Sequence, residues 1–308
     1  MTTPLPTNED APERKWTVLP LLEWTAHYLR ERSFEESRLN AELLLAHALR
    51  LPRLSLYLQF DRPLAARELA LFKKLLLRRM THEPVQYILG ETEFMGLPFE
   101  VTSAVLIPRP ETENLVEESI RWLKSSGSAG GRILEIGTGS GNIAVALGKF
   151  LPGAHVTSLE TSGDALEVAR RNCERHGLGN VEFLRRDVFS AELEGEFDGR
   201  VFDAVVSNPP YVSEAEFNLL EPEVREFEPR LATTDGADGF RFIRRIAGLA
   251  TGVLRPGGGM FLEIGYGQAE AAARIARESG LTGIGVQNDF GGIGRILTGF
   301  AAGGFPPS

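Results

Sequence analysis

Apolar residues recur at two different spacings along this chain, and the change of spacing predicts two parts. From residue 17 to about residue 79 they follow the period of helices that bury one face. Two of the apolar runs, 41–49 and 64–77, have the length of a helix, and no stretch in this part alternates cleanly as a strand does. The pattern predicts a helical N-terminal domain over residues 16–83.

The character of the chain changes after residue 83. Two short apolar runs with turn residues, 87–90 and 94–101, predict short strands. We therefore expect a β-hairpin linker over residues 84–110, between the helical domain and the rest of the chain.

From residue 132 onward, short apolar runs alternate with amphipathic stretches. This alternation is typical of an α/β fold, in which helices cover both faces of a mostly parallel sheet. We expect one such domain over residues 111–308, with seven strands. The predicted strands are 132–136, 155–160, 181–186, 202–207, 258–264, 282–287 and 293–299, and the predicted helices are 141–151, 163–177, 238–254 and 267–279.

The composition narrows the class of protein. The 308 residues suffice for two domains, and a hydrophobic content of 43% is enough for a sizeable core. The formal net charge of -9 disfavours a general nucleic-acid binder, which needs a basic surface for phosphates. The single cysteine, Cys173, excludes an internal disulfide and a cysteine metal site, so we expect no metal.

We expect no targeting signal at the beginning of the chain. Residues 1–15 are polar and include three prolines, so we expect a disordered lead that lacks the apolar core of a signal peptide. No apolar run reaches the length of a membrane span. We expect a cytoplasmic protein without a membrane partner.

The most informative motif is Asn208-Pro209-Pro210-Tyr211, which follows the apolar run at 202–207. Proline has no N–H for a sheet, and each proline holds the residue before it in an extended conformation. The Asn208 side-chain oxygen and the Pro209 carbonyl can therefore point the same way from the end of a strand. Two fixed acceptors suit a planar –NH2 group, whose two hydrogens they would bind. A loop that the prolines merely punctuate is the alternative.

A glycine-rich turn, Gly137-Thr138-Gly139-Ser140-Gly141, follows the first predicted strand of the α/β domain and precedes a helix. Glycines let the backbone bend sharply and approach a ligand closely. The spacing differs from the G-x-G-x-x-G that cradles a pyrophosphate, which disfavours a dehydrogenase.

Two acids follow at the ends of the next two predicted strands. Glu160 could accept hydrogen bonds from both hydroxyls of a ribose, and Asp187 from an adenine amino group. Val188 could pack on the ring or donate its backbone N–H. Singly, Glu160 could cap a helix and Asp187 could belong to a turn. In order on successive strand ends, after the glycine turn, they predict a nucleoside site.

The glycine turn, the two acids and the N-P-P-Y motif together resemble the Rossmann-like S-adenosylmethionine-dependent methyltransferases. Members of that superfamily with N-P-P-Y methylate nitrogens of adenine, guanine or protein glutamine. The resemblance implies S-adenosyl-L-methionine as the cofactor and S-adenosyl-L-homocysteine as the product. It implies cofactor contacts from Gly137, Thr138, Gly139, Ser140, Gly141, Glu160, Asp187, Val188 and Asn208, and substrate contacts from Asn208, Pro209, Pro210 and Tyr211.

Segments outside these motifs resemble the peptide chain release factor glutamine methyltransferases, over about residues 17 to 300. They are Ser37 to Ala46, Glu83 to Gly90, Leu106 to Glu113, Glu226 to Pro229, Asp235 to Gly239 and Asp289 to Arg295. The P-R-P-E-T-E run that ends at Glu113 is the most discriminating. The resemblance implies methylation of the N5 amide nitrogen of the glutamine in the Gly-Gly-Gln motif of release factors, which act in translation termination. It also implies that P-R-P-E-T-E closes over the methionine end of the cofactor, whereas its acids could equally open a helix.

Two positions depart from that family. Glu160 stands where many relatives have Asp, which keeps a carboxylate for the ribose but lengthens its reach. Val188 stands where some relatives have an aromatic residue, which removes a ring that could pack on adenine.

The residues themselves leave alternatives open: a glutamine methyltransferase for a ribosomal protein, a nucleic-acid amino-methyltransferase (adenine N6 or guanine N2), or a non-catalytic cofactor-binding protein. The acidic charge disfavours the nucleic-acid enzyme, and the intact N-P-P-Y disfavours the non-catalytic protein.

The N-P-P-Y motif contains no Cys, His or Lys, so we expect catalysis by positioning. Asn208 Oδ1 and the Pro209 carbonyl would each accept one N–H of the target amide, and Tyr211 would pack against the substrate side chain. We expect a monomer that recognises release factors through its helical domain and binds no nucleic acid directly.

Overall fold

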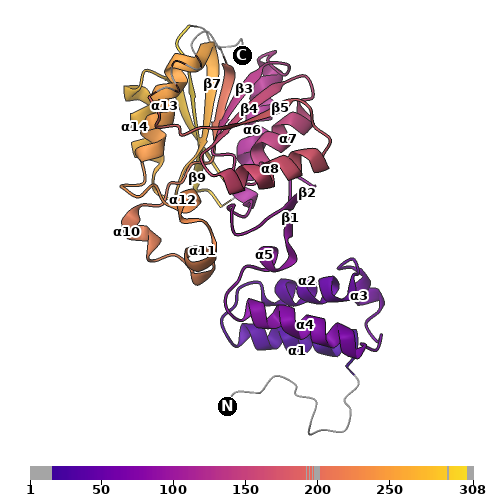
Figure 1. The fold of residues 1–308 in the computed structure, drawn as a ribbon. Helices are drawn as coiled ribbons and strands as arrows, with labels where there is room; N and C mark the ends of the chain where they lie inside the picture. The colour runs from indigo at the N-terminus through magenta and orange to yellow at the C-terminus, as the bar shows by residue number, and fades with distance from the viewer. Residues whose placement is uncertain are drawn as a thin grey trace. The chain divides into compact units, whose positions relative to one another are not determined.

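The computed structural model describes residues 16–191, 193, 195, 197, 202–289 and 291–303. The disordered lead predicted over residues 1–15 lies outside them. The chain divides into two compact units, Met1–Leu89 and Gly90–Ser308 (Figure 1). The predicted hairpin therefore groups with the larger unit.

The smaller unit is helical over its described residues. Its core is formed mainly by leucines and other apolar residues of the three longest helices, such as Leu22, Leu44 and Leu76. The helices predicted at 41–49 and 64–77 are confirmed. The elements are α1 (Val18–Arg30), α2 (Ser37–Leu49), α3 (Ser55–Leu58), α4 (Ala66–Arg79) and α5 (Val85–Leu89).

Polar side chains also hold the smaller unit together. Arg79, only 2% exposed, donates from Nε to Asn40 Oδ1 at 2.7 Å and lies over the ring of Phe34. Glu42, two residues further along α2, accepts a hydrogen bond from Arg38 Nε at 3.0 Å. The segment Ser37 to Ala46 thus uses the polar side chains of Asn40 and Glu42 inside this unit.

The strand predicted at residues 87–90 is wrong, because the segment belongs to helix α5 (Val85–Leu89). Its β-branched and aromatic composition favoured a strand. In the structure Val85 and Ile88 are both buried, at helical spacing, and the Ile88 N–H donates to the Pro84 carbonyl at 3.1 Å. Gly90, at φ +81°, follows the helix in the left-handed region.

The apolar run at 94–101 does form a short hairpin. Strands β1 (Glu91–Phe94) and β2 (Leu97–Glu100) pair antiparallel around a two-residue turn. Both turn residues, Met95 and Gly96, have positive φ angles of 54° and 70°, as the common two-residue hairpin turn requires.

A seven-stranded sheet organises the larger unit, in the order β5-β4-β3-β6-β7-β9-β8. The five strands from β5 to β7 are parallel, and β9 is antiparallel to both β7 and β8. This confirms the predicted Rossmann-like, mostly parallel sheet. The strands are β3 (Arg132–Ile136), β4 (His155–Glu160), β5 (Val181–Arg185), β6 (Phe202–Ser207), β7 (Leu254–Glu263), β8 (Thr282–Asn288) and β9 (Gly294–Phe300). The helices are α6 (Pro110–Ser125), α7 (Asn142–Phe150), α8 (Gly163–Arg175), α10 (Glu214–Phe217), α11 (Pro222–Phe227), α12 (Arg230–Thr233), α13 (Arg241–Val253) and α14 (Ala269–Glu278).

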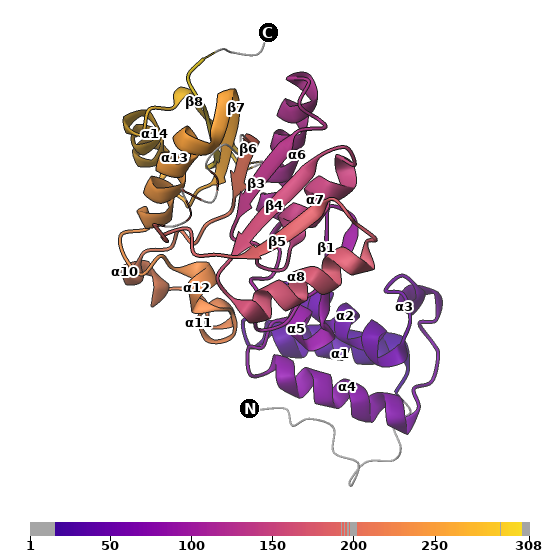
Figure 2. The same cartoon turned by 45° about the horizontal axis from the view of Figure 1, so that its top comes forward.

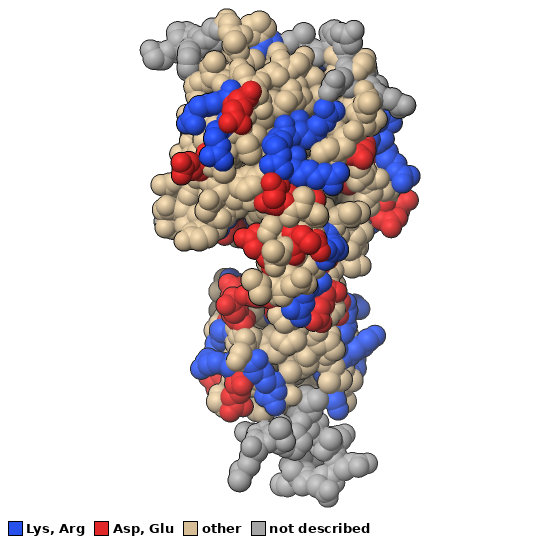
Figure 3. Space-filling view, turned by 90° about the vertical axis from the view of Figure 1, so that its left-hand side faces the viewer, with Lys and Arg blue, Asp and Glu red and all other residues tan. Residues whose placement is uncertain are grey.

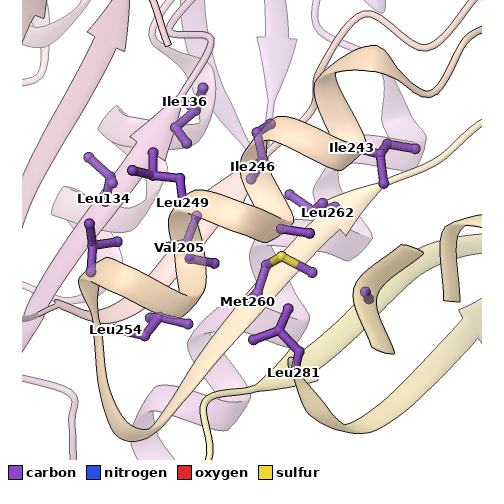
Figure 4. Close-up of a cluster of buried hydrophobic side chains, with 14 of the residues drawn as sticks. Leu134, Ile136, Val205, Ile243, Ile246, Leu249, Leu254, Met260, Leu262 and Leu281 are labelled. Carbon is purple, nitrogen blue, oxygen red and sulfur yellow. The ribbon is translucent and has the colours of Figure 1, made fainter. Parts of the chain in front are cut away.

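Helices cover both faces of this sheet (Figure 2). Successive residues of a strand face opposite sides of the sheet. Val205 and Met260 pack in one cluster with Ile246 of α13 (Figure 4). Val206 and Phe261, their chain neighbours, pack in the opposite cluster with α6 and α7. Strands buried on both faces are nearly continuous in apolar residues, so their positions could be predicted closely.

Charged side chains of both signs lie on each unit. On the face drawn in Figure 3, acidic side chains interrupt the basic ones over both units. Within the described part of the chain, no helix combines the length and the apolar character needed to cross a bilayer.

The strand order reverses direction next to β3. From β3 the chain moves outward through β4 to β5, and it then returns to β6 on the other side of β3. Open α/β sheets bind ligands at such a reversal, beyond the carboxyl ends of the strands. The glycine turn follows β3 and the N-P-P-Y motif follows β6, so the topology brings the two motifs together there.

Candidate active site

A cavity of about 550 Å³ lies at this reversal in the larger unit. Of the predicted site residues, Gly137, Thr138, Gly139, Ser140, Glu160, Asp187, Val188, Asn208, Pro209 and Pro210 line it. Gly141 and Tyr211 are not among the lining residues. One cavity thus unites the strand ends and the two motifs that the sequence separates by some seventy positions.

The glycine turn owes its shape to left-handed backbone. Gly137 and Gly139 have φ angles of +88° and +53°, which side chains other than glycine's rarely allow. The N–H groups of Gly137 and Thr138 both donate to the Leu159 carbonyl, at 2.9 and 3.1 Å, which fixes the turn against the end of β4. A Cβ on Gly141 would lie 3.1 Å from that of Ala169, so this glycine lets α7 approach α8 closely.

Glu160 joins the glycine turn to the start of α8. Its Oε2 accepts from the Gly139 N–H at 3.0 Å, and its Oε1 accepts from the backbone N–H groups of Thr161 and Ser162 at 2.9 and 3.0 Å. These are contacts of the capping kind, and the same carboxylate lies in the cavity wall. Because a carboxylate oxygen can accept two hydrogen bonds, Oε2 keeps capacity for a further donor.

Asp187 and Val188 form the wall beyond β5. Asp187 is exposed, and its Oδ1 accepts from the Phe189 N–H at 2.9 Å, in the manner of a turn residue. Val188 is 4% exposed and belongs to the core cluster of α13, while its carbonyl accepts from Arg245 Nε at 2.6 Å. The pair therefore presents a carboxylate next to a fixed apolar surface.

A chain of hydrogen bonds fixes the side chain of Asn208. Asn208 Nδ2 donates to Thr112 Oγ1 at 2.9 Å, and Thr112 Oγ1 donates to Glu263 Oε2 at 2.6 Å. The Tyr211 hydroxyl donates to Glu263 Oε1 at 3.3 Å. No described residue donates to Asn208 Oδ1, which leaves this acceptor available at the cavity wall. The Asn208–Thr112–Glu263 chain thus connects the loop after β6, the start of α6 and the end of β7.

Burial governs the electrostatics of Glu263. Its side chain is 2% exposed, and burial raises its pKa to about 7, although the hydrogen bonds from Thr112 and Tyr211 act in the opposite direction. The charge of Glu111 adds to the rise and that of Arg295 opposes it. Burial and the neighbouring Glu263 also raise the pKa of the Tyr211 hydroxyl, which therefore keeps its proton at neutral pH.

The P-R-P-E-T-E run is tied to three parts of the larger unit. Arg109 Nη2 contacts both carboxylate oxygens of Glu228 at 2.8 Å, between α11 and α12. Thr112 belongs to the Asn208–Thr112–Glu263 chain, and Glu113 Oε1 accepts from the Met95 N–H of the hairpin turn at 2.6 Å. The predicted helix start is confirmed, because α6 begins at Pro110 with both acids in its first turn.

The sequence of this chain is similar to those of two known proteins. The chain is 44% identical to the release factor glutamine methyltransferase of Geobacter sulfurreducens, over 92% of this chain and 96% of that protein. It is 43% identical to the release factor glutamine methyltransferase of Chlorobaculum tepidum, over 93% of this chain and 98% of that one. This chain belongs to the release factor glutamine methyltransferase family.

Family models match two separate parts of the chain. The PrmC N-terminal domain matches residues 20–90, and the methyltransferase small domain matches residues 114–227. Among solved structures, the hMettl16 catalytic domain in complex with the MAT2A 3′UTR hairpin 6 has a TM-score of 0.52 at 17% identity, covering 67% of this chain and 76% of that one. That likeness is one of fold. The resemblance inferred from the motifs is confirmed, and the chain is a methyltransferase by family.

Sequence reasoning did not find every polar group at the site of this family member. Glu263 was missed because an acid at the end of a buried strand lies far from the motifs in sequence. Its signal was present: the apolar run at 258–262 ends in a carboxylate, as the run before Glu160 does. Thr112 stood inside a recognised motif, but its partners could not be read from one segment.

Proposed function

We propose that this protein transfers the methyl group of S-adenosyl-L-methionine to the N5 amide nitrogen of the glutamine in the Gly-Gly-Gln motif of peptide chain release factors. The observation that carries this proposal is the fixed side chain of Asn208. With Nδ2 bound to Thr112, Oδ1 remains as an acceptor beside Pro209 at the cavity wall. The names of the relatives favour the release factor glutamine as the target.

The cavity has the hydrogen-bond acceptors that a nucleoside cofactor needs. Glu160 offers a carboxylate oxygen for ribose hydroxyls, and Asp187 offers another for an amino group. Val188 supplies the apolar surface beside them, and Gly137 and Gly139 bring backbone close to the cavity without a Cβ. We assign these residues to S-adenosyl-L-methionine, which supplies an activated methyl group on sulfur when bound.

Asn208 and Pro209 then act by positioning. An amide nitrogen is a poor nucleophile because its lone pair is delocalised into the carbonyl. Acceptance of one N–H by Asn208 Oδ1 and the other by the Pro209 carbonyl orients the nitrogen and favours the positive charge that grows on it. Orientation of this kind contributes roughly 7–11 kcal/mol in favourable cases. The proton leaves to water after transfer.

Tyr211 takes a different place in this proposal from the one expected. Its hydroxyl is directed to Glu263, at 3.3 Å, and Gln268 Nε2 donates to its carbonyl at 2.9 Å. We therefore assign Tyr211 to the support of Glu263, and we leave the substrate side chain to Asn208, Pro209 and Pro210.

The smaller unit offers a surface for the protein substrate. Apolar side chains of α3 and its flanks are exposed, with Leu54 at 71% and Leu58 at 75%. We name them the α3 apolar group; they are Leu54, Tyr57, Leu58 and Phe60. A single glutamine gives little binding area, whereas a specific protein complex covers about 800 Å² on each partner. We assign recognition of the release factor to this unit and expect a cytoplasmic, monomeric enzyme.

A labelled-methyl assay tests the proposal against its alternatives. Incubation with labelled S-adenosyl-L-methionine and, separately, a release factor, ribosomal proteins and ribosomal RNA should label the release factor alone. The label should disappear when the Gly-Gly-Gln glutamine is replaced by glutamate. Labelling of ribosomal protein or RNA instead would identify one of the alternative substrates.

A further inference from the structure

We propose that Glu263 and Thr112 are positioning residues that set the direction of the Asn208 amide. This inference rests on the proposed role of Asn208 and goes beyond it. It assigns to the end of β7 and the start of α6 the task of presenting oxygen, rather than nitrogen, to the target –NH2 group.

The direction follows from the donors and acceptors in the Asn208–Thr112–Glu263 chain. An ionised carboxylate only accepts hydrogen bonds, so Glu263 Oε2 forces the single hydroxyl proton of Thr112 toward itself, over 2.6 Å. Thr112 Oγ1 can then only accept from Asn208, which turns Nδ2 toward it at 2.9 Å. Asn208 Oδ1 is left facing the other way, as the acceptor that the target amide requires.

The reverse arrangement would disable the site. A protonated Glu263 can donate to Thr112, whose own proton can then point to Asn208. The Asn208 amide would gain from turning its oxygen to Thr112 and its –NH2 to the cavity. Two –NH2 groups would then face each other across the substrate position, with no acceptor between them.

The surroundings of Glu263 keep this arrangement sharply defined. The side chains of Glu263 and Thr112 are 2% and 1% exposed, so water does not compete for their hydrogen bonds. The Tyr211 hydroxyl occupies the other carboxylate oxygen, at 3.3 Å. Two charged groups also act on Glu263: Glu111 at the start of α6 raises its pKa, and Arg295 on β9 lowers it. Burial brings the pKa of Glu263 to about 7, so the proton that reverses the chain binds within the physiological range.

The test compares Thr112→Val, Thr112→Ser and Glu263→Gln in the full chain, with Thr298→Val as a matched control. Thr298 is a buried threonine on β9 outside the cavity lining, and its Oγ1 donates to the Gly285 carbonyl at 3.4 Å. We expect Thr112→Val to lower kcat by roughly tenfold to a hundredfold, as expected for a misplaced reacting group. Thr112→Ser should restore kcat, and the Kd for S-adenosyl-L-methionine should stay unchanged in both variants.

The pH profile separates positioning from mere packing. In the wild-type enzyme kcat should fall as the pH drops through about 7, where Glu263 takes up its proton. Glu263→Gln keeps an acceptor for Thr112 but cannot titrate, so its kcat should no longer fall on that side. Thr112→Val should be equally insensitive to pH, because the hydroxyl that transmits the change is gone.

Three outcomes would overturn the inference. The first is a kcat of Thr112→Val equal to that of Thr298→Val, and the second is a kcat of Thr112→Ser no higher than that of Thr112→Val. The third is a kcat of Glu263→Gln that still falls at acidic pH as the wild-type kcat does. The variant Asn208→Ala distinguishes this failure from that of the proposed function. If Asn208→Ala is inactive while Thr112→Val is fully active, only the inference fails. If Asn208→Ala is itself active, the proposed role of Asn208 fails.

Discussion

At the scale of single residues, two carboxylates at strand ends have different surroundings, and we propose different tasks for them. Glu160 lies in the cavity wall and already accepts three backbone N–H groups, which keep it oriented toward the cavity. Glu263 is enclosed and reaches the cavity only through Thr112. In our proposal the first binds the cofactor and the second orients the side chain of Asn208.

Replacement of Glu160 by alanine should weaken cofactor binding far more than turnover. Bonds to a ribose are similar in the ground and transition states, so their loss raises KM and leaves kcat mostly intact. Loss of charge-assisted hydrogen bonds worth about 1.5–3 kcal/mol predicts a Kd roughly ten to a hundred times higher, measured by calorimetry. Glu182→Ala, an exposed acid on β5, is the control. Unchanged affinity would leave Glu160 as a capping residue only.

Glu135, in the middle of β3, should make stability depend on pH. It is fully buried and accepts a hydrogen bond from Ser158 Oγ, and burial raises its pKa from 4.5 to about 8. The folded protein therefore binds this proton more tightly than the unfolded chain does. By linkage, the free energy of unfolding contributed by this group falls as the pH rises from about 4.5 to about 8.

The variant Glu135→Gln removes that slope. Its melting temperature should exceed that of the wild type at alkaline pH and approach or fall below it at acidic pH, because each unit of pKa shift corresponds to about 1.4 kcal/mol. Parallel pH profiles of the two proteins in thermal unfolding would contradict the assignment.

At the scale of elements, the buried strands could be predicted from sequence almost residue by residue, whereas the short elements could not. The run at 202–207 is mostly apolar on both faces, a pattern that predicts a buried strand. Helices α10, α11 and α12 were not predicted. They are four to six residues long and bury at most one residue each, so they leave no apolar periodicity. They depend on local features such as the Ser213 capping box and a proline at the start of α11. Segment 87–90 failed for a related reason, since one turn of helix leaves no periodicity to detect.

The same contrast holds for the site. Motifs that act within one segment, such as the glycine turn, were found from sequence, and the cavity brings them together. Side-chain contacts between distant segments could not be predicted from the sequence. Arg109 and Glu228, for example, are 119 positions apart. Only the folded chain shows that an ion pair joins P-R-P-E-T-E to the segment Glu226 to Pro229.

That ion pair should stabilise the connection between the start of α6 and the segment between α11 and α12. Glu228 is buried, and burial raises its pKa although Arg109 opposes the rise. Arg109→Ala leaves the carboxyl without its cation, which should cost about 1–3 kcal/mol of unfolding free energy in denaturant titration. Arg109→Ala combined with Glu228→Gln should recover part of this loss, because no unpaired charge remains. Additive losses in the double variant would show that the two side chains act independently.

At the scale of the whole molecule, we propose that the larger unit binds the cofactor and the smaller unit recognises the protein substrate. The larger unit holds the cavity. The smaller unit exposes the α3 apolar group, whereas Asn40 and Glu42 make their hydrogen bonds inside it. Exposed apolar clusters on soluble proteins commonly mark interaction sites.

Leu58→Asp should raise KM for an intact release factor by roughly tenfold, as loss of an interface residue worth more than 1 kcal/mol predicts. Because Leu58 is 75% exposed, the melting temperature should not change. Methylation of a short peptide that contains Gly-Gly-Gln should be unaffected. Leu77→Asp, at an exposed position of α4, is the matched control. Equal KM values for both variants on the intact protein would contradict a role for the α3 apolar group.

The central claim is that Asn208 directs methyl transfer to one amide nitrogen, and mass spectrometry of the product tests it most directly. A release factor incubated with the wild-type enzyme and S-adenosyl-L-methionine should gain one methyl group, located by fragmentation on the side-chain nitrogen of the Gly-Gly-Gln glutamine. Asn208→Ala should bind S-adenosyl-L-methionine normally by calorimetry and yield no methylated peptide. A methyl group on another residue, or an Asn208→Ala rate above about a tenth of the wild-type rate, a loss of only about 1.4 kcal/mol, would contradict the account.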